Sequence, residues 1–229
     1  MFWYRLAMNK SAHGLAALAF FLMVWLGAMG PAHADANSDG LGALSAFLKN
    51  AQSGRAEFTQ VVTSPAQEGR KAKSKTSTGV FEFQRPAHFR FDYKKPFEQT
   101  LVADGQTLWL HDPDLNQVTS RSQAQTLNNT PVALVASAAD LKALQADFVL
   151  SNAPDHDDLV WVSAVPKARD GTLKAVNIGF RGDQLVLLDV QDNLGQRSVL
   201  RFGAFQLNPN FGPAEFQFKP PPGADLLKQ

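Results

Sequence analysis

The alternation of aromatic and polar residues is the feature that most constrains the fold of this chain. In Val80–Phe83 and in Phe89–Tyr93 an aromatic side chain stands at every second position. Successive side chains of a β-strand point to opposite faces of a sheet, so each segment predicts a strand with one aromatic face. The pair Asp104-Gly105 predicts a hairpin turn between two further strands, because a tight primed turn needs positive φ angles.

The same pattern extends along most of the chain. Roughly eleven short strands follow one another between Arg55 and Gln206, and turn-forming residues separate most of them. Consecutive strands joined by hairpins form a meander, which is an antiparallel sheet that curls into a barrel or an open half-barrel. The proline-rich tail Phe216–Gly223 predicts an extended segment that leaves the last strand. The predicted fold is therefore mainly β.

Helical patterns stand at the start and in the middle of this strand series. Asp39–Lys49 carries apolar residues at spacings of three and four, which predicts an amphipathic helix. Residues 121–146 break the strand pattern, and within them Thr130-Pro131 combines a capping hydroxyl with a proline suited to the first helical position. Ser137 and Asp140 predict a capping box for a further helix. We expect these helices to cover the open face of the sheet.

Residues 1–34 have the organisation of a cleaved secretory signal peptide. A basic start with Arg5 precedes the apolar run Leu15–Leu26 and the small residues Ala32–Ala34. Because a membrane span needs about 20 apolar residues, this twelve-residue run favours cleavage after Ala34 over the alternative of a retained anchor helix. Residues 35–229 show neither a linker nor a repeat, so we expect one exported domain.

Composition excludes several classes of function. The charges nearly balance, with 22 Lys and Arg against 21 Asp and Glu, which argues against nucleic acid as the main partner. The absence of cysteine excludes disulfides, iron–sulfur clusters, thiol nucleophiles and an acylated N-terminal cysteine. No G-x-S-x-G motif occurs, and Asp155–Asp158 is interpreted as a solvated loop, with a metal cluster as the alternative. We therefore expect no enzyme, no metal and no cofactor.

The basic run Arg70–Lys75 is the one clear block of like charge. It contains four basic residues in six positions and falls between the first two predicted strands. A loop that aids solubility is the simpler interpretation. Binding to an anionic membrane surface or to an acidic patch of a partner is the alternative.

The excess of phenylalanine predicts an apolar interior. Fourteen of the 17 Phe residues lie within residues 35–229, where Tyr93 is the single tyrosine. A curved sheet with Phe on one face must fill its concave side, either with its own side chains as a dry core or with an apolar guest. Composition leaves both possibilities open.

Five segments, in order along the chain, carry a family resemblance: Ala56–Gln60, Phe83–Phe91, Val102–Trp109, Asn129–Pro131 and Phe218–Gly223. With these segments the chain resembles the LolA family of periplasmic outer-membrane lipoprotein carrier proteins. The similarity extends over essentially all of residues 35–229, and Arg70–Lys75 is the stretch that departs from it.

The resemblance implies a fold, a function and partners. The fold is an unclosed eleven-stranded antiparallel barrel, covered by three helices, around a hydrophobic cavity for acyl chains. The function is that of a periplasmic, monomeric carrier, which takes acylated lipoproteins from the inner-membrane ABC transporter LolCDE and passes them to the outer-membrane receptor LolB. LolB needs an acylated cysteine, which this chain lacks. A periplasmic lipid or lipoprotein sensor on the same scaffold, and a lipid-modifying esterase, are the alternatives.

The resemblance also implies a lid and its latch. Arg85 follows the strand of Phe81 and Phe83 at the same parity, and in this family the arginine at this position holds backbone carbonyls of the lid helix. A rim arginine paired with a carboxylate is the alternative. The expected lid residues are Thr130, Pro131, Val132, Leu134 and Val135, within Thr130–Ser137. By strand parity, the expected lining of the acyl-chain cavity is Phe81, Phe83, Phe89, Phe91 and Trp109, with partner contact or a core role as the two interpretations of Phe89.

Overall fold

A computed structural model describes residues 39–66, 71–124, 136, 138–169 and 171–229 of the chain. The chain divides into two units, Met1–Ala36 and Asn37–Gln229, and every described residue lies in the second unit. The predicted signal segment, residues 1–34, therefore lies outside the described residues. Across the described ranges, no helix has the length and hydropathy needed to cross a membrane.

The second unit is built mainly of β-strands. The helices are α1 (Gly40–Asn50) and α4 (Leu141–Asp147), and the strands are β1 (Ser53–Ser64), β2 (Lys73–Gln84), β3 (His88–Lys95), β4 (Gln99–Asp104), β5 (Thr107–Asp112), β6 (Gln117–Ser122), β7 (Phe148–His156), β8 (Leu159–Pro166), β9 (Leu173–Arg181), β10 (Gln184–Asp192), β11 (Arg197–Phe202), β12 (Gln206–Leu207) and β13 (Asp225–Lys228).

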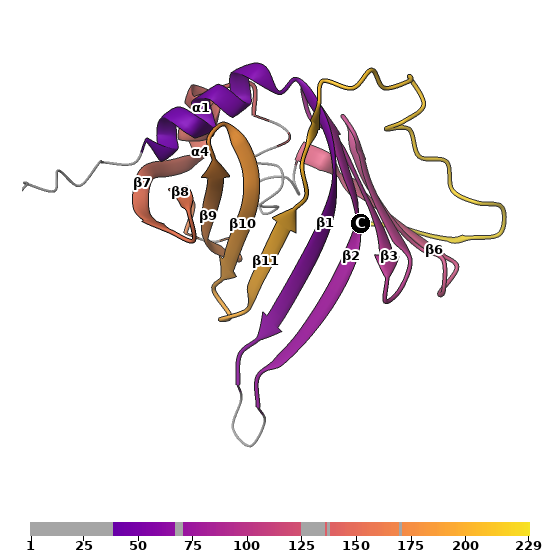
Figure 1. Cartoon of the computed structure of the whole chain (residues 1–229). Helices are drawn as coiled ribbons and strands as arrows, with labels where there is room; N and C mark the ends of the chain where they lie inside the picture. Colours follow the sequence, from indigo (N-terminus) through magenta and orange to yellow (C-terminus); the bar gives the residue numbers. More distant parts are fainter. Residues whose placement is uncertain (1–38, 67–70, 125–135, 137, 170) are drawn as a thin grey trace, which may run out of the picture. The chain divides into compact units, whose positions relative to one another are not determined.

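All thirteen strands belong to one curved, unclosed sheet (Figure 1). Its strand order is β13-β6-β5-β4-β3-β2-β1-β11-β10-β9-β8-β7, with β12 paired to β1 beside this path. Neighbouring strands run antiparallel, except that β13 runs parallel to β6. The two end strands, β13 and β7, do not pair with each other. The predicted fold class, an open antiparallel barrel that is mainly β, is confirmed.

The sheet has two strands more than the eleven predicted, and both lie near the C-terminus. β12 is a two-residue contact with Gly54 and Arg55 of β1. β13 arises because the chain turns at Gly223, where φ is +80°, and returns to the edge of β6. Phe216–Gly223 leaves the last strand as predicted, whereas the return of residues 225–228 to the sheet was not predicted. A four-residue strand has too few alternating positions to be recognised without its partner.

Helix α1 forms where it was predicted. The Asp39 carboxylate accepts a hydrogen bond from the Gly42 backbone N–H at 2.7 Å and so caps the helix start. Leu44, Phe47 and Leu48 are buried on one side, and α1 contacts strands β7 to β10 (Figure 1). The helix therefore covers the part of the sheet that β7 to β10 form.

Helix α4 begins later than the predicted capping box implied. Asp140 has an extended backbone, with φ −157° and ψ 178°, and its carboxylate accepts a hydrogen bond from the Ala143 backbone N–H at 2.8 Å. Asp140 is therefore the cap rather than the third helical residue, and Ser137 lies outside the described residues. Among the described ranges, α1 and α4 are the complete helices, so the three expected helices are not all tested.

The two faces of the sheet differ in what covers them. We call the face packed against α1 the inner face, and it carries Phe81 and Phe83; the opposite, outer face carries Glu82. The C-terminal segment, residues 208–224, covers part of the outer face: the Phe218 ring lies 5.6 Å from that of Trp109. Asn116 Nδ2 donates to the Gly223 carbonyl at 2.8 Å, which fixes the end of this segment.

Glu82 is a buried carboxyl group beneath the C-terminal segment. Its side chain is 3% exposed, and Arg55 Nη1 lies 3.0 Å from its Oε1. Burial raises the pKa of Glu82 to about 7; Arg55 opposes this shift, while the charge and hydrogen bond of Glu215 add to it. The protonated carboxyl group of Glu82 is thus the form that favours the folded state, and it helps to hold Glu215 of the C-terminal segment on β2.

We expect Glu82→Gln to remove a pH dependence of stability. Because the folded-state pKa of Glu82 is raised from 4.5 to about 7, its contribution is complete below pH 4.5 and is lost as the pH rises through 7. The wild type should lose up to about 3 kcal/mol of unfolding free energy relative to the variant between pH 4.5 and 8. Urea denaturation at both pH values measures this. Glu57 is an exposed residue of β1 on the same outer face as Glu82, so Glu57→Gln serves as the control and should keep the wild-type pH dependence of stability. An unchanged pH dependence in Glu82→Gln would contradict the raised pKa of Glu82.

Candidate functional site

A cluster of phenylalanine rings fills the inner face of the sheet. The rings of Phe81 and Phe91 lie 4.5 Å apart, those of Phe58 and Phe91 5.3 Å, and those of Phe81 and Phe202 5.6 Å. Tilted and edge-to-face pairs of this kind stabilise a core by about 0.5–1.5 kcal/mol each beyond burial alone. We define the phenylalanine cluster as Phe47, Phe58, Phe81, Phe83, Phe89, Phe91, Phe180, Phe202 and Phe205.

Helix α1 closes the cluster from above. Its Phe47 ring lies 6.1 Å from Phe83, 6.0 Å from Phe180 and 6.1 Å from Phe205, so one side chain joins both halves of the sheet. Phe81, Phe83 and Phe89 have no exposed surface. The rings of these described residues contact one another in this conformation.

Arg85 connects this cluster to the chain around it. Its Nε donates to the Ala51 carbonyl at 2.9 Å, and its Nη1 donates to the Ala138 carbonyl at 2.6 Å. Ala51 is the C-cap of α1, whereas Ala138 precedes α4. The guanidinium group also lies over the rings of Phe83 and Phe47, at 5.3 and 5.9 Å from their centroids. One side chain therefore ties α1 to the segment that follows the expected lid.

The charge of Arg85 is poorly compensated. Burial lowers its pKa to about 10, so it remains a cation at neutral pH. Within the described residues its partners are carbonyl groups rather than a carboxylate, and its Nη2 is buried without a hydrogen-bond partner. The alternative of a rim arginine paired with a carboxylate finds no such partner among these residues. A buried cation held only by carbonyls and rings gives the closed form less stability than an ion pair would.

The expected lid residues Thr130, Pro131, Val132, Leu134 and Val135 lie outside the described residues. The described residues that follow them in the chain are Ala136 and Ala138. Ala136 has no exposed surface and Ala138 is 8% exposed, and both belong to the same apolar core as the phenylalanine cluster. The segment that follows the expected lid thus reaches the inner face beside Arg85.

Four of the five residues expected to line a cavity lie on the inner face. Phe81, Phe83, Phe89 and Phe91 all point to it, because Phe81 pairs with Phe91 and Phe83 with Phe89 between β2 and β3. Phe89 is fully buried, and its ring meets that of Phe91 at 6.2 Å in an edge-to-face arrangement. In this conformation Phe89 is therefore a core residue.

Trp109 lies on the outer face, and its expected place in the cavity was wrong. It pairs with Val102, whereas its neighbour Leu108 pairs with Ala103 on the inner face. Its indole Nε1 donates to Asp104 Oδ2 at 2.7 Å, and Phe218 covers its ring. The alternation in β5 is ambiguous, since Leu108 and Trp109 are both apolar, and only the register with β4 decides which of them faces inward.

Sequence reasoning did not assign five other rings of the cluster to the site. These are Phe47 on α1, Phe58 on β1, Phe180 on β9, Phe202 on β11 and Phe205 beyond it. For Phe58, Phe180 and Phe202 the signal is the same alternation, but strands remote in sequence can be assigned to one face only when their pairing is known. The pairing of Phe58 with Phe202 supplies that link.

The phenylalanine cluster ends in a polar belt toward the free end of the β1–β2 hairpin. Tyr93 Oη donates to Gln60 Oε1 at 3.0 Å, and Gln60 Nε2 donates to Ser198 Oγ at 2.8 Å. Burial raises the pKa of Tyr93 to about 12, so it stays a hydrogen-bond donor at neutral pH. Beside the belt lies a pocket of about 430 Å³, the rim pocket, whose lining includes Gln60, Tyr93, Lys75 and Phe97.

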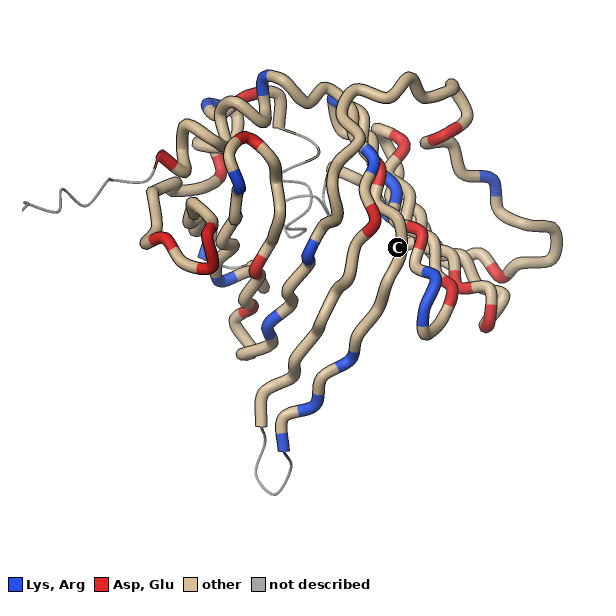
Figure 2. The backbone as a smooth tube through the Cα atoms, viewed as in Figure 1, with Lys and Arg blue, Asp and Glu red and all other residues tan. Residues whose placement is uncertain are grey.

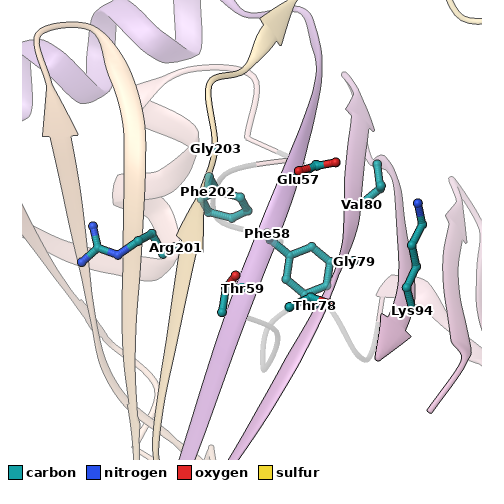
Figure 3. Close-up of a pocket in the computed structure, with 10 residues that line it drawn as sticks. All are labelled: Glu57, Phe58, Thr59, Thr78, Gly79, Val80, Lys94, Arg201, Phe202 and Gly203. Carbon is teal, nitrogen blue, oxygen red and sulfur yellow. The ribbon is translucent and has the colours of Figure 1, made fainter. Parts of the chain in front are cut away.

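The outer face carries hollows of a different chemistry. One, of about 380 Å³, is lined by the charged residues Glu57, Arg201 and Lys94 as well as by apolar residues such as Phe58, Val80 and Phe202 (Figure 3). A second, of about 390 Å³, lies between Glu82 and the C-terminal segment. Charged linings of this kind do not suit acyl chains, so the inner face is the candidate site.

Of the predicted loop Asp155–Asp158, only Asp157 and Asp158 form the turn between β7 and β8, because β7 extends to His156. Asp157 and Asp158 both have positive φ, 56°, and His156 pairs with Leu159 across the turn. The four side chains are exposed. A search of the described residues finds no group of three or more His, Asp or Glu side chains arranged to hold a metal ion.

Comparisons with known proteins give consistent matches. The family model "Outer membrane lipoprotein carrier protein LolA" matches residues 49–219. Outer-membrane lipoprotein carrier proteins of Albidiferax ferrireducens and Leptothrix cholodnii are 56% and 51% identical to this chain, over 85% and 86% of it and over 93% and 89% of their own lengths. A solved structure of a LolA superfamily protein from Nitrosomonas europaea covers 78% of this chain and 97% of its own, at 13% identity and a TM-score of 0.46. The sequence relatives are the stronger finding.

We expect Trp109→Phe to weaken the fold without weakening the binding of acyl chains. The variant loses the hydrogen bond to the Asp104 carboxylate, which should lower the unfolding free energy by about 1–3 kcal/mol. Phe83→Leu, on the inner face, serves as the contrast and should alter the binding of a fluorescent acyl-chain probe. Urea denaturation and probe titration separate the two effects. If folded Trp109→Phe loses the probe while Phe83→Leu keeps it, the assignment of faces is wrong.

Proposed function

This chain belongs to the LolA family of outer membrane lipoprotein carrier proteins, and on that premise we propose that it carries acylated lipoproteins through the periplasm. The observation that carries this proposal is the identity of 56% with a curated carrier over 93% of that protein's length. The curated relatives are named as carriers, which favours a carrier over the sensor and esterase alternatives. The proposed activity is transport without a catalytic step.

The phenylalanine cluster supplies the apolar surface that such a carrier needs. Hiding one methylene group from water is worth about 0.8 kcal/mol, so a triacylated anchor with roughly forty methylenes would cost on the order of 30 kcal/mol to expose. Such an anchor cannot cross an aqueous compartment unaided. Rings that pack against one another when the carrier is empty can pack against acyl chains when it is loaded, which supports reversible rather than maximal binding.

We propose that Arg85 is the latch of the empty carrier. Its bonds to the Ala51 and Ala138 carbonyls hold α1 and the segment after the expected lid together over the cluster. Entry of acyl chains would separate these elements and break at least one of the two bonds. Reforming them in the empty state would favour release of the cargo, because a hydrogen bond to a charged group is worth about 1.5–3 kcal/mol.

The proposed partners follow from the family. A LolCDE-like ABC transporter of the inner membrane would supply the lipoprotein, and a LolB-like receptor of the outer membrane would accept it. The carrier would act as a monomer between them, with Thr130–Ser137 as its lid.

Native mass spectrometry tests the carrier function directly. The protein, without its proposed signal segment, is incubated with a purified triacylated lipoprotein; we expect a complex whose added mass is that of the intact cargo. The matched control is the same lipoprotein with its acylated cysteine replaced by serine, which should not bind. A cargo of changed mass would indicate an enzyme, and the absence of any complex would refute the carrier function.

For Arg85→Leu we expect normal or tighter cargo binding and poor onward transfer. Removing the latch destabilises the empty closed form. The free energy of cargo binding then becomes more favourable by up to about 1.5–3 kcal/mol, which is roughly a 10- to 100-fold gain in affinity for the cargo. Transfer of labelled lipoprotein to a LolB-like receptor measures the effect. Arg181→Leu, which removes an exposed arginine at the end of β9, is the control and should transfer normally. Normal transfer by a folded Arg85→Leu protein would remove the latch role.

A further inference from the structure

The inner face changes its chemistry along a single strand. On β2 the inward positions run, from its free end, Lys73, Lys75, Ser77, Gly79, Phe81 and Phe83, because Lys75 pairs with Val62 and Phe81 with Ala56 on the same face of β1. The strand thus passes from cationic through small and polar to aromatic side chains. Lys and Arg positions gather along this free end of β2 (Figure 2).

Neighbouring strands share the step from aromatic to polar side chains at the same level. The polar belt of Tyr93, Gln60 and Ser198 lies beside Ser77, since Gln60 pairs with Ser77 and with Leu200 of β11. Beyond the belt, Lys75 Nζ lies 5.2 Å from the centre of the Phe97 ring, which is 61% exposed. The change from rings to polar groups is therefore shared by neighbouring strands, whereas the lysines belong to β2, where Lys75 pairs with Val62 and Lys73 with Ser64 of β1.

The spacing of these zones fits an acylated ligand. Lys75 stands six residues before Phe81, which corresponds to about 20 Å along a strand. That distance is close to the length of an extended fatty acyl chain. An acyl chain that ends among the rings and lies along β2 therefore brings the group attached to its head to the polar belt, with Lys73 and Lys75 next along its path.

The rim pocket also carries the other sign of charge. Glu98 of the β3–β4 turn, Asp112 at the end of β5 and Asp114 of the β5–β6 turn line this pocket together with Lys75. An anionic chain that leaves the pocket is repelled by these three carboxylates and attracted by Lys75. Its favoured path is then along the β1–β2 hairpin, past Lys75 to Lys73.

We propose that Lys73 and Lys75 bind acidic side chains in the polypeptide segment that directly follows the acylated end of the cargo, so that the carrier prefers lipoproteins with an acidic segment there. This inference rests on the proposed function and adds a cargo preference to it. The interpretation of the basic run Arg70–Lys75 as a loop was wrong for Lys73 and Lys75, because β2 begins at Lys73. The lysines are exposed, so each contributes a modest, salt-dependent preference rather than the bulk of the affinity.

Three synthetic peptides with the same triacylated cysteine test the proposal. The residues after the cysteine are acidic in the first, neutral in the second and basic in the third, and each peptide displaces a fluorescent acyl probe from the protein. We expect the acidic peptide to bind about 3- to 10-fold more tightly than the neutral one at low salt, and the preference to vanish at high salt. Lys73→Gln/Lys75→Gln should abolish the preference while leaving affinity for the neutral peptide unchanged.

Three further variants control for charge and position. Lys94→Gln removes an exposed lysine beside the outer-face pocket and should keep the preference. Asp114→Asn removes a carboxylate that lines the rim pocket and should increase the preference for the acidic peptide. Lys73→Gln alone retains the Lys75–Phe97 contact, so a partial loss in this variant excludes a purely structural effect of Lys75.

The outcomes separate this inference from the proposed function. Equal affinities for the three peptides in the wild type would overturn the cargo preference and leave the carrier function intact. Failure of all three peptides to bind would overturn the carrier function itself. If the double variant keeps its preference for the acidic peptide but loses binding to vesicles of anionic phospholipid, the lysines serve a membrane surface instead and the proposal is wrong.

Discussion

The contact of Phe47 with the phenylalanine cluster is the interaction on which the rest of the structure depends. An open sheet has an inner face that water would reach, and this one carries rings from strands at both ends of the chain. Through Phe83, Phe180 and Phe205, the single ring of Phe47 seals both halves at once. Since the sheet is not closed by strand pairing, the helix that covers it can move without breaking the strand ladder. This contact therefore stabilises the described part of the interior.

Arg85 limits the stability of this core. A guanidinium group buried among rings, with carbonyl partners and an unpaired Nη2 within the described part of the chain, stabilises the closed form less than a full ion pair would. A carrier needs a closed form of intermediate stability. If the closed form is too stable, cargo cannot enter; if it is too unstable, cargo is not released. The position of Arg85 also matters, because its guanidinium group donates hydrogen bonds both to Ala51 at the end of α1 and to Ala138 before α4.

The two faces of the sheet differ in their chemistry and in their roles. The inner face is apolar, then polar, then cationic, in the order that an acylated polypeptide presents its own parts. The outer face holds the buried Glu82 and the Trp109–Asp104 hydrogen bond, and the C-terminal segment covers both before β13 completes the edge at β6. Charged groups on the outer face thus serve the fold, whereas those at the rim of the inner face are free to meet a ligand.

Sequence by itself determined the strand series, helix α1 and the presence of Phe81, Phe83, Phe89 and Phe91 on one face, because alternation and turn chemistry are local properties of the chain. Parity with Phe81 and Phe83 also predicted the face to which Arg85 points, while the family resemblance supplied its role as a latch. Tertiary structure decided what depends on register between strands: Leu108 rather than Trp109 faces inward, Phe58 meets Phe202 across β1 and β11, and the tail returns as β13. It also decided the partners of Arg85, since the carbonyls of Ala51 and Ala138 lie 34 and 53 residues away along the chain. Local sequence fixes which side of a strand a residue occupies, but only pairing fixes which sides become one surface.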